Sequence, residues 1–268
     1  MTELLALSDN GRPVTALDDG SGPTLLVVHP GGGNATTWDG VTHHLVDDFR
    51  VVRICRRIYV SEADITLPHS MAVEAADIAA VADLLEPPVL LVGHSSGAVA
   101  ALEAALLGQS AYAGLCLYEP PLPTKELIAG STGARARAEL DNGDAVEAMR
   151  IHMRDIVRMP TTVVDAMFAD QHMRAALSLY AAAQIADNEA IDALGVGIDR
   201  FATLETPAVL IEGDRSPAHL RERLADLAAV LPNGRIVTLT GQGHVAHLTA
   251  PDALADTIRN MAAQVLHL

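Results

Sequence analysis

The chain has 268 residues, 50% of them hydrophobic, which suits one large domain or one domain with an insertion. Its formal net charge of −16 argues against nucleic acid or an anionic membrane as a partner, because both are negatively charged. The first 19 residues lack a signal-peptide pattern, and no apolar run is long enough to span a bilayer. We therefore expect a cytoplasmic protein that acts on a small molecule, as a monomer or a homodimer.

The N-terminal part of the chain predicts short strands separated by turns. The expected strands are 4–7, 14–17, 24–29 and 49–55. Asn10-Gly11 predicts a turn between the first two strands. Residues 24–29 are continuously apolar, which is typical of a strand buried on both faces of a parallel sheet, and Pro30-Gly-Gly-Gly33 ends this run. A short helix is expected over 38–45.

An irregular connection is expected over 56–68, before a helix capped by Ser70 and ending at Leu85. The connection contains Arg56-Arg57 and Asp64. We interpret these charged residues as forming a structural salt bridge and expect no catalytic role for them.

The stretch 88–107 carries the strongest signal in the chain. It predicts a buried strand, a sharp turn at Gly93-His-Ser-Ser-Gly97 and a buried helix. The turn matches G-x-S-x-G in the strand–turn–helix context that a nucleophile elbow requires. Small residues are needed on both sides of Ser95 because strand and helix nearly touch there.

The rest of the chain alternates between strands and helices, except for one long helical block. Strands are expected over 114–119, 208–212 and 235–239, and helices over 217–231 and 251–266. This alternation predicts an α/β fold with a mostly parallel sheet covered by helices on both faces. We assign 1–121 and 204–268 to this core, and 122–203 to a helical lid (cap) inserted in it.

The serine needs a base and an oxyanion site to act as a nucleophile. His244 follows the last strand on a glycine-flanked loop that can reach back over the sheet, whereas His247 is expected to begin the packing of the last helix. The backbone N–H of Ser96 is one expected oxyanion donor. The second is Gly31, with Gly32 as the alternative, because a run of glycines lets the main chain approach a ligand closely.

These motifs together resemble the α/β-hydrolase fold family. The glycine loop, the elbow at Ser95, the helical insertion and the late His244 stand in the family's order, and the resemblance covers nearly the whole chain. It implies an α/β-hydrolase fold in which a serine, an acid and a histidine act together.

The acid is the point at which the sequence departs from the commonest pattern of that family. Most members carry an aspartate before a proline after the strand that follows the insertion, and Ser216 stands there. The acid is therefore either the neighbouring Asp214 or Glu119, which ends the strand after the elbow. We favour Glu119, because zearalenone-lactonase-like members of the family place their acid there, and their elbow is also similar.

The resemblance implies a cofactor-independent serine hydrolase that cleaves an ester or a lactone through an acyl-enzyme. No spacing of histidines, cysteines and carboxylates suggests a metal site. Apolar side chains of the insertion are expected either to bind a largely apolar substrate or to form ordinary core: Met149, Met153, Ile156, Met167, Phe168 and Leu177. Two alternatives stay open. One is a C–C bond hydrolase or a non-hydrolytic enzyme of secondary metabolism, and the other is a ligand-binding protein without turnover.

Overall fold

A computed structural model of the chain describes residues 2–8, 11–60 and 69–266. The expected turn at Asn10-Gly11 and the expected role of Asp64 involve positions outside these ranges. The described residues form an eight-stranded sheet in the order β1-β2-β4-β3-β5-β6-β7-β8. The strands are β1 (Thr2–Leu7), β2 (Pro13–Gly20), β3 (Thr24–Val28), β4 (Arg50–Ile54), β5 (Val89–His94), β6 (Tyr112–Tyr118), β7 (Ala208–Gly213) and β8 (Gly234–Leu239).

Only one edge of the sheet is antiparallel. There β2 pairs antiparallel with both β1 and β4, whereas all pairs from β4 to β8 are parallel. Every residue of β3 and β5 is buried, as expected for parallel strands that are covered on both faces. The predicted strands and the mostly parallel sheet are therefore confirmed.

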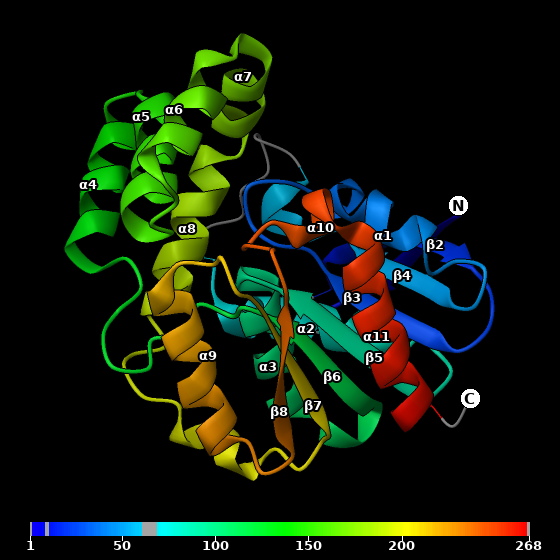
Figure 1. The fold of residues 1–268 in the computed structure, drawn as a ribbon. Helices are drawn as coiled ribbons and strands as arrows, with labels where there is room; N and C mark the ends of the chain where they lie inside the picture. The colour runs from blue at the N-terminus through cyan, green and yellow to red at the C-terminus, as the bar shows by residue number, and fades with distance from the viewer. Residues whose placement is uncertain (1, 9–10, 61–68, 267–268) are drawn as a thin grey trace.

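Helices cover the two faces of the sheet (Figure 1). On one face α2 (Met71–Ala82), α3 (Ser96–Leu107) and α9 (Ala218–Val230) bury their apolar side chains in one large cluster. On the other face α1 (Asp39–His43) and α11 (Pro251–Val265) pack in a second cluster. None of the helices in the described ranges has both the length and the apolar character needed to cross a bilayer.

Local sequence signals explain where several helices begin. The Ser70 hydroxyl accepts a hydrogen bond from the Val73 N–H at 3.2 Å and so caps α2, as predicted. The single helix expected over 38–45 is instead the 3-10 turn η1 (Ala35–Trp38) followed by α1. Asn34 caps η1 through its side-chain oxygen, which is why helical structure begins earlier than expected.

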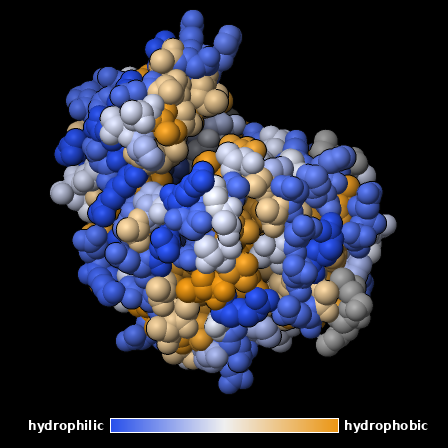
Figure 2. Space-filling view, viewed as in Figure 1, coloured by the Kyte–Doolittle hydropathy of each residue, from blue (hydrophilic) through white to orange (hydrophobic). Residues whose placement is uncertain are grey.

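Between β6 and β7 the described chain is helical, and Figure 1 shows the helices from α4 to α8 as a group beside the sheet. We call α4 to α8, including the π-helical turn η5, the inserted helices. They are α4 (Gly130–Asp141), α5 (Ala145–Ile151), η5 (His152–Ile156), α6 (Thr161–Ala169), α7 (Gln171–Leu179) and α8 (Ala181–Asp192). In Figure 2 the surface is hollowed between this group and the core.

Candidate active site

The candidate residues all follow the carboxyl ends of parallel strands. Gly31 follows β3, Ser95 follows β5, Glu119 follows β6, Asp214 follows β7 and His244 follows β8. Because the carboxyl ends of parallel strands meet at the same edge of a sheet, the fold gathers these five residues there.

Ser95 lies in a sharp turn between β5 and α3. Its backbone has φ 53° and ψ −126°, a conformation that a residue with a side chain rarely adopts. The turn fits only because its flanking residues are glycines. A Cβ on Gly93 would lie 2.5 Å from Cα of Ala98, and a Cβ on Gly97 would lie 2.4 Å from the carbonyl oxygen of His29. The close approach of strand and helix expected from the sequence is present.

The structure brings Ser95, His244 and Glu119 together. Nε2 of His244 lies 3.1 Å from the Ser95 hydroxyl, and Nδ1 lies 2.6 Å from Oε2 of Glu119. Since a carboxylate can only accept, Nδ1 donates to Glu119, and Nε2 is left to accept the hydrogen of the serine hydroxyl. This is the geometry in which an imidazole can take a proton from a serine.

Glu119 is held rigidly at the end of β6. Its carboxylate is fully buried, and Oε1 accepts the backbone N–H of Gly213 at 2.8 Å while Oε2 accepts from His244. Its backbone has a positive φ of 44°, which turns the chain sharply after the strand. A buried carboxylate that uses both oxygens in this way can stabilise a positive charge on the imidazole.

Asp214 lies elsewhere in the hydrogen-bond network. Its Oδ1 accepts the Gly241 N–H at 2.7 Å, so it caps the turn after β8, and its side chain is exposed. The neighbouring Ser216 is buried. Of the two carboxylates left open by the sequence, the one bonded to His244 is Glu119.

Two residues that the sequence did not identify as site residues hold the His244 loop. The Tyr118 hydroxyl donates to the Gly243 carbonyl and accepts the Ala246 N–H at 3.2 Å. Nε2 of His94 donates to the His244 carbonyl at 2.9 Å, and the His94 ring stacks on Tyr118 with 4.4 Å between centroids. Burial lowers the pKa of His94 well below its usual value, so its ring is neutral. No pattern in the sequence connects these two residues to the loop.

The expected oxyanion donors lie beside Ser95. Gly31, Gly32 and Ser96 all line the pocket that contains the serine. Gly31 is closely packed, since a Cβ there would lie 2.2 Å from Oε1 of Gln184. Gly32 has φ +72°, a conformation that suits glycine. Ser96 is the first residue of α3, so its N–H is one of the free donors at that helix terminus.

The fully buried guanidinium of Arg56 contacts the elbow at Ser96. Nη1 of Arg56 donates to the Ser96 hydroxyl at 2.9 Å, Nε to Glu74 at 2.9 Å, and Nη2 to both oxygens of Asp187 at 2.8 and 2.9 Å. Burial alone would raise the pKa of Asp187, but Arg56 holds it well below its usual range. Arg56 therefore links the core to α8. The structural salt bridge expected at Arg56 is formed with Glu74 and Asp187.

The sequence matches one protein-family model. Residues 25–257 match the model of the alpha/beta hydrolase family. The chain belongs to this family. No curated protein matches the chain.

Several solved structures share the α/β-hydrolase fold of this chain. An alpha/beta hydrolase from Sphaerobacter thermophilus is 27% identical, with a TM-score of 0.83, and the match covers 96% of this chain and 99% of that one. A thermophilic esterase from Thermogutta terrifontis is 20% identical, with a TM-score of 0.76 and 99% of both chains covered. An N-acyl homoserine lactone degrading enzyme is 18% identical, with a TM-score of 0.74 and 96% and 99% covered.

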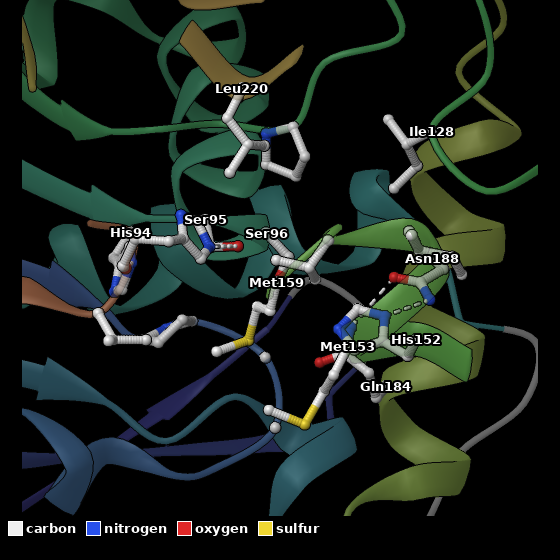
Figure 3. A pocket seen from close by; sticks show the side chains of 18 of the residues that line it. His94, Ser95, Ser96, Ile128, His152, Met153, Met159, Gln184, Asn188 and Leu220 are labelled. Atoms are coloured by element: carbon white, nitrogen blue, oxygen red, sulfur yellow. Dashed lines mark hydrogen bonds between the residues drawn. The ribbon is translucent and has the colours of Figure 1, made fainter. Parts of the chain in front are cut away.

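In this α/β-hydrolase a cavity of about 200 Å³ lies between the sheet edge and the inserted helices. The labelled side chains in Figure 3 show Ser95 on the core side, with Met153 of η5 and Met159 of the connection between η5 and α6 nearby. Five of the expected apolar residues line this cavity: Met149, Met153, Ile156, Met167 and Leu177.

Phe168 is a correction to the expected lining. It is buried among the inserted helices, where it packs with Val164, and the Arg150 guanidinium lies 4.7 Å from its ring centroid. Residues 167 and 168 are neighbours on α6 and point in different directions, so Met167 reaches the cavity and Phe168 does not.

Proposed function

We propose that this α/β-hydrolase is a cofactor-independent serine hydrolase that cleaves an ester or a lactone of a largely apolar small molecule. The observation that supports the proposal most is the hydrogen-bonded series Ser95–His244–Glu119 at the edge of the cavity. The apolar lining of the inserted helices supports an apolar substrate, and we propose that these helices act as a lid. The esterase from Thermogutta terrifontis, which shares this fold, agrees with the reaction class.

The reaction begins with the transfer of the Ser95 hydroxyl proton to Nε2 of His244 as Oγ attacks the substrate carbonyl. Glu119 stabilises the imidazolium that results. The carbonyl oxygen becomes an oxyanion, which accepts hydrogen bonds from the backbone N–H groups of Ser96 and Gly31. Collapse of this intermediate breaks the ester bond, and His244 returns the proton to the leaving alcohol.

The second half of the reaction releases the acid. Water loses a proton to Nε2 of His244 and attacks the acyl carbon, which forms a second tetrahedral intermediate. Collapse breaks the bond to Oγ, and the proton returns from His244 to Ser95. For a lactone the leaving alcohol is part of the same molecule, so the product is one hydroxy acid. The position of Glu119 after β6 favours lactonase-like activity, because the resemblance to zearalenone-lactonase-like members rests in part on it.

A fluorophosphonate probe tests the nucleophile directly. We expect the probe to label the wild-type protein and the Ser96→Ala variant, and to leave Ser95→Ala unlabelled. The adjacent Ser96 is the matched control, because its hydroxyl is bonded to Arg56 and lies away from His244 in the hydrogen-bond network. Turnover of p-nitrophenyl esters and of γ- and δ-lactones should disappear in the Ser95→Ala variant. Undiminished labelling of Ser95→Ala, or unchanged ester turnover by it, contradicts the proposal.

A further inference from the structure

The side of the cavity formed by the inserted helices is apolar except for three polar side chains. These are His152 at the start of η5, and Gln184 and Asn188 on α8. The mechanism proposed above uses none of them. All three are labelled in Figure 3, where dashed lines join them into one chain. A hydrogen-bonded chain among methionines needs an explanation, since buried polar groups are stabilised only when they are paired.

The chain of hydrogen bonds has a defined direction. Nε2 of Gln184 donates to Oδ1 of Asn188 at 3.1 Å, so the Asn188 amide nitrogen faces His152. That nitrogen donates to Nδ1 of His152 at 3.0 Å. Because Nδ1 accepts, a neutral His152 ring carries its hydrogen on Nε2. Burial lowers the pKa of His152 to about 4, so the ring is neutral at pH 7.

The remaining donor, Nε2 of His152, is open to the cavity. Among the residues that the structure describes, none accepts a hydrogen bond from it. Nε2 of His152 is not fully buried, in contrast to Nδ1 of His94 and Nδ1 of His247, which are buried without a partner. In Figure 3 the His152 ring lies across the cavity from Ser95. It begins a π-helical turn, a local distortion often found at functional sites.

Among the described residues that line the cavity, the one guanidinium is already hydrogen-bonded. It belongs to Arg223 and donates to the backbone carbonyls of Leu122, Glu126 and Leu127. The polar chain of His152, Asn188 and Gln184 carries no positive charge, so a carboxylate beside His152 would gain only neutral donors there. The available partner for a neutral imidazole N–H is a neutral acceptor oxygen.

We infer that His152 determines specificity. Its Nε2 donates a hydrogen bond to a neutral oxygen on the apolar part of the ester or lactone, at a distance from the scissile bond. The inference rests on the proposed function and narrows its substrate class to esters or lactones with a second oxygen of the ketone, ether or hydroxyl type. Asn188 and Gln184 are positioning residues, which fix the His152 tautomer and ring orientation.

Binding to the Ser95→Ala variant tests the inference without turnover. The probes are p-nitrophenyl octanoate and its 4-, 5-, 6- and 7-oxo derivatives, which move one ketone along an otherwise identical chain. One neutral hydrogen bond predicts that one oxo derivative binds roughly 2- to 12-fold more tightly than the plain ester. Dissociation constants are measured by displacement of a fluorescent apolar dye. Equal affinities for all five esters would overturn the inference.

Two histidines of the same cavity supply a matched pair of variants. In the Ser95→Ala background, His152→Phe should remove the preference for the oxo derivative, whereas His219→Phe should retain it. His219 also lines the cavity, and burial lowers its pKa to about 4, but it lies outside the polar chain. The ratio of the two dissociation constants within each variant is compared, so a general loss of affinity does not affect the result. A preference that survives His152→Phe overturns the inference.

The tautomer gives a second, spectroscopic test of the donor on which the inference depends. The 15N spectrum of the histidine rings should show His152 protonated on Nε2, with its signals identified by their loss in His152→Phe. Asn188→Leu removes the donor to Nδ1 and should reduce both this tautomer and the oxo preference. Protonation of Nδ1 of His152 in the Ser95→Ala protein contradicts the inference.

Failure of this inference and failure of the proposed function are distinguishable. The proposed function fails if the wild-type protein does not turn over these esters through Ser95. The specificity inference fails on the binding ratios in Ser95→Ala, which need no turnover.

Discussion

At the scale of single residues, Glu119 combines an uncommon backbone conformation with two carboxylate hydrogen bonds. Glu119 adopts a left-handed φ of 44°, which costs energy for a residue with a side chain. Its two carboxylate hydrogen bonds, to Gly213 and His244, offset this cost and fix the side chain beneath the imidazole. Asp214, only one residue after Gly213, is exposed and accepts the Gly241 N–H instead. Proximity in sequence to the usual acid position is therefore no guide here.

Paired substitutions test this assignment. Glu119→Gln keeps the size of the side chain but removes the charge that stabilises the imidazolium, so we expect kcat to fall by about 10²- to 10⁴-fold. Asp214→Asn should leave kcat within about threefold, because it alters only a turn cap. Steady-state turnover of a p-nitrophenyl ester measures both, with circular dichroism as the control for folding. The reverse pattern, with loss of turnover only in Asp214→Asn, would assign the acid to Asp214.

At the scale of elements, the contact between β3 and α3 determines the elbow. Gly97 lies against the backbone of Val28 and His29, with the nearest carbonyl oxygens 2.4 and 2.5 Å from where a Cβ would stand. Backbone atoms cannot rotate away as a side chain can. Any larger residue must therefore separate the helix from the strand that leads to the glycine loop, which would move both proposed oxyanion donors.

Two glycines near opposite ends of α3 allow a controlled test. Gly97→Ala should lower the free energy of unfolding by roughly 1–3 kcal/mol through overpacking. Gly108→Ala has open space for its methyl group, with no atom within 4 Å, and should change stability by less than about 0.5 kcal/mol. Urea denaturation followed by circular dichroism gives both values. Similar losses in the two variants would show that the close contact at Gly97 is not the cause.

At the scale of the whole molecule, buried histidines link stability to pH. Burial lowers the pKa of His29 to about 3, and the pKa values of His152 and His247 to about 4. The unfolded chain binds protons to these rings below about pH 6.5, while the folded protein does not. Their contribution is complete above about pH 6.5 and is lost as the pH falls toward 4. Burial raises the pKa of Asp77 to about 6, which offsets part of this loss.

The free energy of unfolding should therefore decrease between pH 6.5 and pH 4.5. Each buried histidine contributes a slope of at most about 1.4 kcal/mol per pH unit. His247→Gln should reduce the slope by one such contribution, whereas His172→Gln should not, because His172 is exposed and hydrated in both states. Urea titrations at several pH values measure these slopes. A stability that is constant over this range would contradict the assignment of neutral buried rings.

The sequence by itself determined the order of elements and the nature of the elbow. Apolar runs such as 24–28, glycines at Gly93 and Gly97 and the cap at Ser70 are local signals, and local physics is sufficient to interpret them. The mostly parallel sheet and its gathering of strand ends followed from the alternation of strands and helices.

Only the tertiary structure decided which side chains meet. The bond between Glu119 and His244 spans 125 residues and that between Arg56 and Asp187 spans 131, so neither leaves a periodic or local pattern. For the same reason the sequence could not predict that Met167 reaches the cavity whereas its neighbour Phe168 packs between helices. Contacts of this kind depend on the orientation of whole elements, which no single stretch of the chain encodes.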